Sequence, residues 1–149
     1  MKSMWDGDAP GEMRDRLARI MPDRAAAWGR MTAPQMVCHL AESLKMAMGE
    51  LQVAPKNLPI RFPPLKQLIV YYAPFPKNAP TAPELVARVP RDWPADVADL
   101  QALVDCFVAR GGDARAVWPA HPAFGRLSRR AWGVLVYRHM DHHLRQFGA

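Results

Sequence analysis

Three of the five histidines lie in the last helix-like stretch of the chain, residues 128–147. In a helix at this position, His139 and His143 stand one turn apart and continue an apolar stripe that includes Trp132 and Leu135. The arginines and Asp141 fall on the opposite side. Two imidazoles that leave one helix face four residues apart can converge on a single point. A metal ion is the simplest occupant of that point, so we interpret His139 and His143 as a candidate ligand pair.

His142 lies between the apolar stripe and the charged face of the same helix. It could pair with His139 at a spacing of three residues. It lies about 100° from His143 around the helix, so these two side chains do not converge. We therefore interpret His142 as a neighbour of the pair.

A second helix, expected over residues 33–48, carries His39. Thr32 and Gln35 form a capping box at its start, and Gly49 is suited to end it. His39 lies on the edge of the apolar face of this helix, where it would line a seam between helices. That position suits a metal ligand that leaves room for substrate. A lone helix histidine is, however, more often a partly buried, hydrogen-bonded side chain, and periodicity leaves both interpretations open.

The remaining pattern predicts an all-α fold. Further amphipathic helices are expected over residues 12–20 and 95–110, the second ended by Gly111-Gly112, and the apolar run 65–72 is a shorter helical candidate. Many of the 15 prolines lie in residues 52–64 and 73–83, which are scarce in glycine and serine and therefore predict ordered loops. No alternating strand pattern occurs, so the helices must position the histidines.

Length and composition predict one domain over residues 11–149, preceded by a flexible N-terminus, residues 1–10. Half of the 149 residues are hydrophobic, enough for an independent core. No secretory signal or spanning segment is recognisable, so we expect a cytoplasmic protein with no membrane partner. Two distant cysteines predict no disulfide framework. The net charge of +6 comes from scattered arginines, which indicates solubility and no nucleic-acid partner.

Three blocks of sequence resemble a known family. They are Trp28-Gly29-Arg30-Met31-Thr32 followed by Gln35-Met36-Val37-Cys38-His39-Leu40; Pro74-Phe75-Pro76-Lys77-Asn78-Ala79-Pro80-Thr81-Ala82-Pro83-Glu84; and His121-Pro122-Ala123-Phe124-Gly125 followed by Trp132, His139, His143 and Gln146. With these blocks the chain resembles the DinB-like (DinB/YfiT-like) superfamily of helical-bundle metalloenzymes, in the branch whose activity is unassigned. The resemblance covers nearly the whole chain after residue 10.

The resemblance implies a four-helix bundle with Pro-rich connecting loops, in which His39, His139 and His143 bind one divalent metal ion. Zinc, nickel, iron or manganese would accept three imidazoles, and the set leaves at least one position open for water or substrate. Such an ion lowers the pKa of a bound water or thiol and polarises a carbonyl. Members of the superfamily include thiol-dependent transferases, isomerases and hydrolases.

The expected function is therefore a metal-dependent transferase or hydrolase acting on a small substrate with the help of a low-molecular-weight thiol. The alternative is a non-catalytic metal-binding or stress-response bundle. An exposed helix face would also allow a homodimer.

Three more side chains are weaker candidates. Glu42 could orient His39 or act as a base, although a solvated carboxylate on the helix surface is the simpler interpretation. Gln146 could donate a hydrogen bond near the ion or only pack at the end of the helix. His121 could approach the site from its loop, or its place before Pro122 could serve a turn that seats the last helix.

Overall fold

Five α-helices and no strands make up the fold of the chain, whose computed structural model describes residues 1–149. The helices are α1 (Ala9–Leu17), α2 (Ala33–Met48), α3 (Leu65–Gln67), α4 (Trp93–Gly112) and α5 (Arg129–Gln146). Three short irregular helices lie in the connections, at Pro59–Arg61 (η1), Leu68–Tyr72 (η2) and Pro83–Leu85 (η3). The expected all-α class is confirmed.

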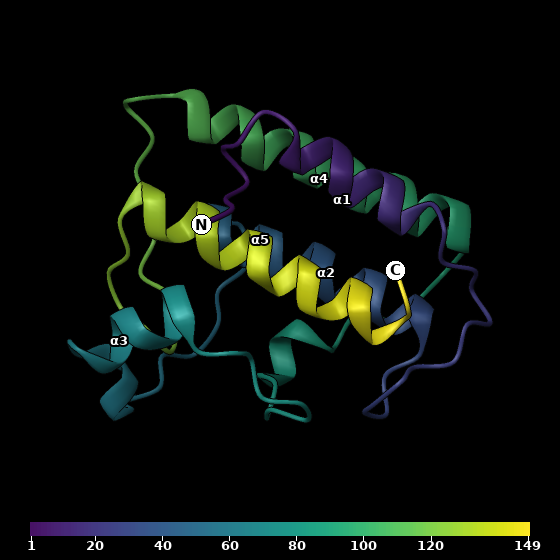
Figure 1. Cartoon of the computed structure of the whole chain (residues 1–149), viewed down its shortest axis with the longest axis horizontal. Coiled ribbons are helices and arrows are strands. Elements are labelled where there is room, and N and C mark those ends of the chain that lie inside the picture. Colours follow the sequence, from purple (N-terminus) through teal and green to yellow (C-terminus); the bar gives the residue numbers. More distant parts are fainter.

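The long helices pack through the apolar faces that their sequences predict. Helix α2 packs along α4, while α1 contacts both α4 and α5. Figure 1 shows α1 and α4 on one side of α2 and α5, with α3 and the connecting segments between α2 and α4 on the other side. Trp132, Phe107 and Leu40 are among the largest fully buried side chains. The core therefore extends along α2, α4 and α5, and two of these helices, α2 and α5, carry the candidate ligands.

Local capping determines where these two helices begin. The Thr32 hydroxyl accepts a hydrogen bond from the backbone N–H of Gln35, and the Gln35 side chain accepts one from the N–H of Thr32. Gly49 ends α2 in the left-handed conformation, with φ of 85°. The predicted bounds 33–48 and the capping box are confirmed. Ser128 caps α5 by accepting a hydrogen bond from the N–H of Ala131.

Two other helices differ from their predicted bounds. Helix α1 begins three residues before the predicted start, because Pro10 fits the first turn of a helix, and it ends at Leu17. Helix α4 begins two residues early because the Asp92 side chain caps it. It also continues through Gly111 and Gly112, which were expected to end it.

The N-terminal segment before α1 packs against the core. Met4 is fully buried, and the indole of Trp5 stacks on Phe107 with a centroid distance of 4.9 Å. A Cβ at Gly111 would overlap the Trp5 ring, so this glycine leaves the space that Trp5 occupies. The expected flexibility of residues 1–10 is a statement about motion, which a single structure does not test, and it stays a prediction.

The long connection between α2 and α4 contains the Pro-rich loops. Its apolar run is helical, as predicted: α3 continues into the wider turns of η2. Arg138 of α5 donates hydrogen bonds to the carbonyl oxygens of Ile69, Val70 and Ala73 and so ties the connection to α5. No helix is long and apolar enough to cross a membrane.

Candidate metal centre

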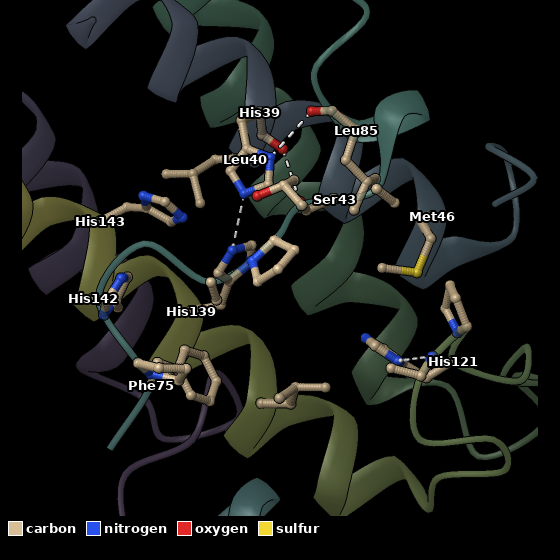
Figure 2. A pocket seen from close by; sticks show the side chains of 18 of the residues that line it. His39, Leu40, Ser43, Met46, Phe75, Leu85, His121, His139, His142 and His143 are labelled. Atoms are coloured by element: carbon tan, nitrogen blue, oxygen red, sulfur yellow. Dashed lines mark hydrogen bonds between the residues drawn. The ribbon is translucent and has the colours of Figure 1, made fainter. Parts of the chain in front are cut away.

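The rings of His39, His139 and His143 meet between α2 and α5. Their centroids form a nearly equilateral triangle with sides of 5.0, 4.8 and 4.9 Å. One nitrogen from each ring lies within 4.8 Å of the other two. Figure 2 shows the three rings turned toward one another. The three histidines therefore lie close enough to bind one metal ion, as the sequence led us to expect.

Burial keeps the three imidazoles neutral. His39 and His143 are 3% and 9% exposed. Burial lowers the pKa of His39 and brings that of His143 to about 3. Burial, together with the neighbouring His143 and His39, also holds the pKa of His139 well below its usual value. Neutral imidazole is the form that binds metal, so no proton has to leave before an ion can enter at neutral pH.

Hydrogen bonds to two of the rings decide which nitrogen is free. Nδ1 of His39 donates to the backbone carbonyl of Leu85 at 3.1 Å, and Nδ1 of His143 donates to Oε1 of Gln146 at 2.8 Å. A neutral ring that donates from Nδ1 has its lone pair on Nε2. Such outer partners orient the imidazoles of metal sites and raise their basicity.

The inner nitrogens fit a shared cation. Nε2 of His39 lies 3.1 Å from Nε2 of His139. Because Nε2 of His39 carries no proton, the His139 ring must either donate a proton to it or share an ion with it. Bonds of about 2.0–2.1 Å in a tetrahedral zinc site would place two ligand nitrogens about 3.3 Å apart. The donor set and its spacing therefore fit a divalent ion.

A network of charged residues holds the loop that carries the Leu85 carbonyl. Arg88 donates to Asp99 at 2.6 Å and to Asp96 at 2.7 Å, which fastens the loop to α4. It also lies 3.6 Å from a carboxylate oxygen of Glu42. The Leu85 carbonyl lies 46 residues from His39 in the sequence, so this partner could not be predicted from helical periodicity.

A cavity of about 640 Å³ opens onto the histidine triad. Helices α2 and α5, residues 28–31, the Pro-rich connection and the loop 121–124 form its walls, and 20 of its 36 lining residues are hydrophobic. Phe75 of the second Pro-rich loop lies near the triad, with its ring centroid 6.3 Å from that of His139. The cavity offers a small molecule a mainly apolar surface beside the triad.

Two of the weaker candidates have structural partners of their own. Glu42 is 9% exposed, so its interpretation as a solvated carboxylate is wrong. It accepts a hydrogen bond from Lys45 at 2.9 Å and does not line the cavity. Nδ1 of His121 accepts hydrogen bonds from the N–H groups of Ala123 and Phe124, which confirms a role in the turn, and the ring also lines the cavity.

His142 and Gln146 lie beside the triad. The His142 ring contacts the rings of Trp28 and Phe75 at centroid distances of 5.6 and 5.9 Å, and it also lines the cavity. It is not among the three convergent histidines, in agreement with its place on the helical wheel. Gln146 accepts from His143 and donates to the carbonyl of Trp28 at 2.8 Å. From the sequence we considered Gln146 as a donor near the ion, whereas in the structure it accepts from the His143 ring and donates to Trp28.

The fold and the triad define an all-helical protein with a site able to hold a metal ion. The model of the family described as "Protein of unknown function (DUF1569)" matches residues 8–149, and the chain belongs to this family. No curated protein and no solved structure matches the chain.

Proposed function

We propose that the protein is a divalent-metal-dependent enzyme of the DinB-like superfamily, with a four-helix bundle formed by α1, α2, α4 and α5. In this proposal His39, His139 and His143 bind zinc, nickel, iron or manganese. The reaction is a group transfer or hydrolysis on a small substrate, assisted by a low-molecular-weight thiol. The protein acts in the cytoplasm and can form a homodimer.

One observation carries this proposal: three neutral imidazoles from two helices converge at the wall of a cavity of about 640 Å³. Structural zinc sites are usually closed by four protein ligands, whereas catalytic sites have three and an open position. No cysteine or carboxylate belongs to the cluster with the three histidines. This donor set supports an open site.

The residues around the triad have separate tasks in this proposal. Leu85 and Gln146 hold two rings with Nε2 turned inward. Phe75 and the other apolar walls exclude water from the bound substrate. A divalent ion held by the triad would supply Lewis acidity, which polarises a carbonyl and lowers the pKa of a bound thiol or water.

The second candidate is a non-catalytic metal-binding or stress-response bundle. It uses the same triad but makes no use of the cavity. Both candidates therefore predict a bound metal ion. Only the enzyme predicts turnover and needs the apolar walls of the cavity.

Metal content tests the part that both candidates share. We would purify the chain without a polyhistidine tag, restore each of the four metals in turn, and measure bound metal by mass spectrometry for wild type, His143→Ala and His142→Ala. We expect about one ion per wild-type chain, loss of the ion in His143→Ala, and retention in His142→Ala, whose side chain lies outside the triad. An ion content that His143→Ala leaves unchanged contradicts both candidates.

Turnover separates the two candidates. The metal-loaded protein would be screened for transfer of small electrophiles to thiols and for ester and amide hydrolysis. The enzyme proposal predicts turnover that His143→Ala abolishes. A metal-loaded protein without turnover in any of these reactions supports the binder.

A further inference from the structure

Half of the large hydrophobic side chains that the protein exposes lie in one short segment. Ten such side chains are exposed in the whole chain, and five of them belong to residues 58–72. These five, which we call the apolar patch, are Leu58, Phe62, Leu65, Leu68 and Tyr72. Phe62 and Tyr72 are 62% and 71% exposed. Exposed apolar side chains that gather in this way are typical of a contact surface.

The helical turns of α3 and η2 place most of the patch on one outer face. Leu65, Leu68 and Tyr72 are spaced by three and four residues, so their side chains share a face. Val70, which a helical wheel places opposite to them, is buried. Figure 1 shows α3 at the edge of the molecule, on the side away from α1 and α4. The apolar patch therefore faces outward from the bundle.

Four cations accompany the patch, and none of them forms an ion pair. They are Lys56, Arg61, Lys66 and Arg126. The Arg61 guanidinium donates to the backbone carbonyl of Lys56 at 3.0 Å, and Nζ of Lys66 donates to that of Arg126 at 3.2 Å. Residues 51–83 contain no aspartate or glutamate. The surface around the apolar patch is therefore positively charged.

We propose that the apolar patch docks the protein on an anionic lipid surface. Apolar side chains of peripheral proteins enter the boundary between head groups and acyl chains, while lysine and arginine bind anionic head groups. The patch offers both kinds of contact, with Lys66 and Arg126 at the level of the head groups. The absence of a spanning helix led us to expect no membrane partner, but a peripheral contact needs no such helix.

Two other occupants fit the patch less well. A second copy of the chain would bring two sets of cations together with no carboxylate between them, which opposes self-association through this face. Leu58 belongs both to the patch and to the cavity wall, so the mainly apolar cavity borders the surface that would meet the lipid. This continuity favours lipid over a protein partner. Entry of a substrate from the lipid rests on the proposed function, whereas docking requires no metal ion.

Co-sedimentation of metal-free protein with vesicles tests the proposal. One set of vesicles is phosphatidylcholine alone, and the other is equal parts of phosphatidylcholine and phosphatidylserine. We expect wild type to bind the mixed vesicles at least about tenfold more tightly than the neutral ones. Raising the salt concentration about fivefold should remove most of this difference, because salt screens charges at the surface.

A double variant tests the apolar contacts. Phe62→Ser with Leu68→Ser should lower the affinity for mixed vesicles by about tenfold or more. Val86→Ser with Val89→Ser is the matched control, because it removes two exposed apolar side chains from the connection between η3 and α4. The control should change the affinity by no more than about twofold.

A charge reversal tests the cations. Arg126→Glu should lower the affinity for mixed vesicles by about tenfold, since each cation near an anionic surface contributes about fivefold. Arg19→Glu changes the net charge equally at an exposed residue that follows α1, on the other side of the bundle, and should have an effect within about twofold.

Three results with vesicles would each overturn the proposal. They are no binding of wild type to mixed vesicles, equal binding to both kinds of vesicle, and undiminished binding by the Phe62→Ser and Leu68→Ser double variant. Light scattering would reveal the other occupant: a wild-type dimer that this double variant converts to a monomer would mean that a second copy covers the patch. Because all these measurements use metal-free protein, their failure leaves the metal proposal standing.

Discussion

Oε1 of Gln146 accepts a hydrogen bond from Nδ1 of His143 at 2.8 Å, one turn along the same helix. The other end of the amide donates to the carbonyl of Trp28, so a flipped amide would lose this bond and place two carbonyl oxygens against each other. The carbonyl of Trp28 thereby determines which end of the Gln146 amide faces the ring. Nδ1 must carry the proton, and Nε2 of His143 is left with its lone pair facing the other two histidines.

Removing this acceptor should weaken metal binding. In Gln146→Leu the His143 ring loses the partner that orients it, and loss of such partners typically lowers metal affinity by about 10- to 100-fold. Competition with a chromophoric chelator would measure the affinity. Arg145→Ala is the control, because the Arg145 side chain is 70% exposed and points away from the triad. Equal affinities for Gln146→Leu and wild type would show that Gln146 only packs at the helix end.

Acid should destabilise the protein partly through His121. Burial lowers the pKa of His121 to about 4, whereas the unfolded chain titrates near about 6.5. Between these values the unfolded state binds more protons than the folded state. The free energy of unfolding therefore falls as the pH is lowered from about 6.5 toward 4, with a slope from this residue of up to about 1.4 kcal/mol per pH unit.

His121→Asn isolates this contribution. The asparagine oxygen can accept hydrogen bonds from the backbone N–H groups of Ala123 and Phe124, as Nδ1 does, but it does not titrate. Urea unfolding of metal-free protein should give a shallower pH slope for the variant below about pH 6.5 and parallel behaviour above it. Identical slopes over the whole range would mean that His121 is protonated in the folded state.

The N-terminal segment should contribute to stability through Gly111. A Cβ at this position would overlap the indole of Trp5, so Gly111→Ala must displace Trp5 from Phe107. Overpacking of this kind costs about 1–3 kcal/mol of unfolding free energy. Urea unfolding would measure it, with Trp5 fluorescence as a probe of displacement.

The next residue gives a matched comparison. No atom lies within 4 Å of a Cβ built at Gly112, so Gly112→Ala should be neutral or should stabilise the protein by up to about 1 kcal/mol. If the two variants have the same stability, the contact of Trp5 with α4 is not part of the core in solution.

Elements with local signals could be predicted from the sequence. Thr32, Gln35 and Gly49 specify both ends of α2 within the helix itself, and the predicted bounds are those observed. The bounds of α4 could not be predicted in the same way. The position of Gly111 within α4 accommodates Trp5, which lies more than a hundred residues earlier, and no local pattern carries that information.

In the candidate site, too, the features with local sequence signals could be predicted and those set by tertiary packing could not. The spacing of His139 and His143 on one helix is local, so their convergence could be predicted from periodicity. Periodicity left the role of His39 open, and only the family resemblance favoured a metal ligand, because the packing of α2 against α5 is a tertiary property. The Leu85 carbonyl, 46 residues from His39, could be recognised only in the folded molecule.

Anomalous diffraction from crystals of untagged protein, recorded at the absorption edges of zinc, nickel, iron and manganese, tests the central claim most directly. We predict one strong peak between α2 and α5 at about 2.0–2.3 Å from one nitrogen of His39, His139 and His143. Ordered crystals loaded with each of these metals that show no peak within bonding distance of the three rings would contradict it.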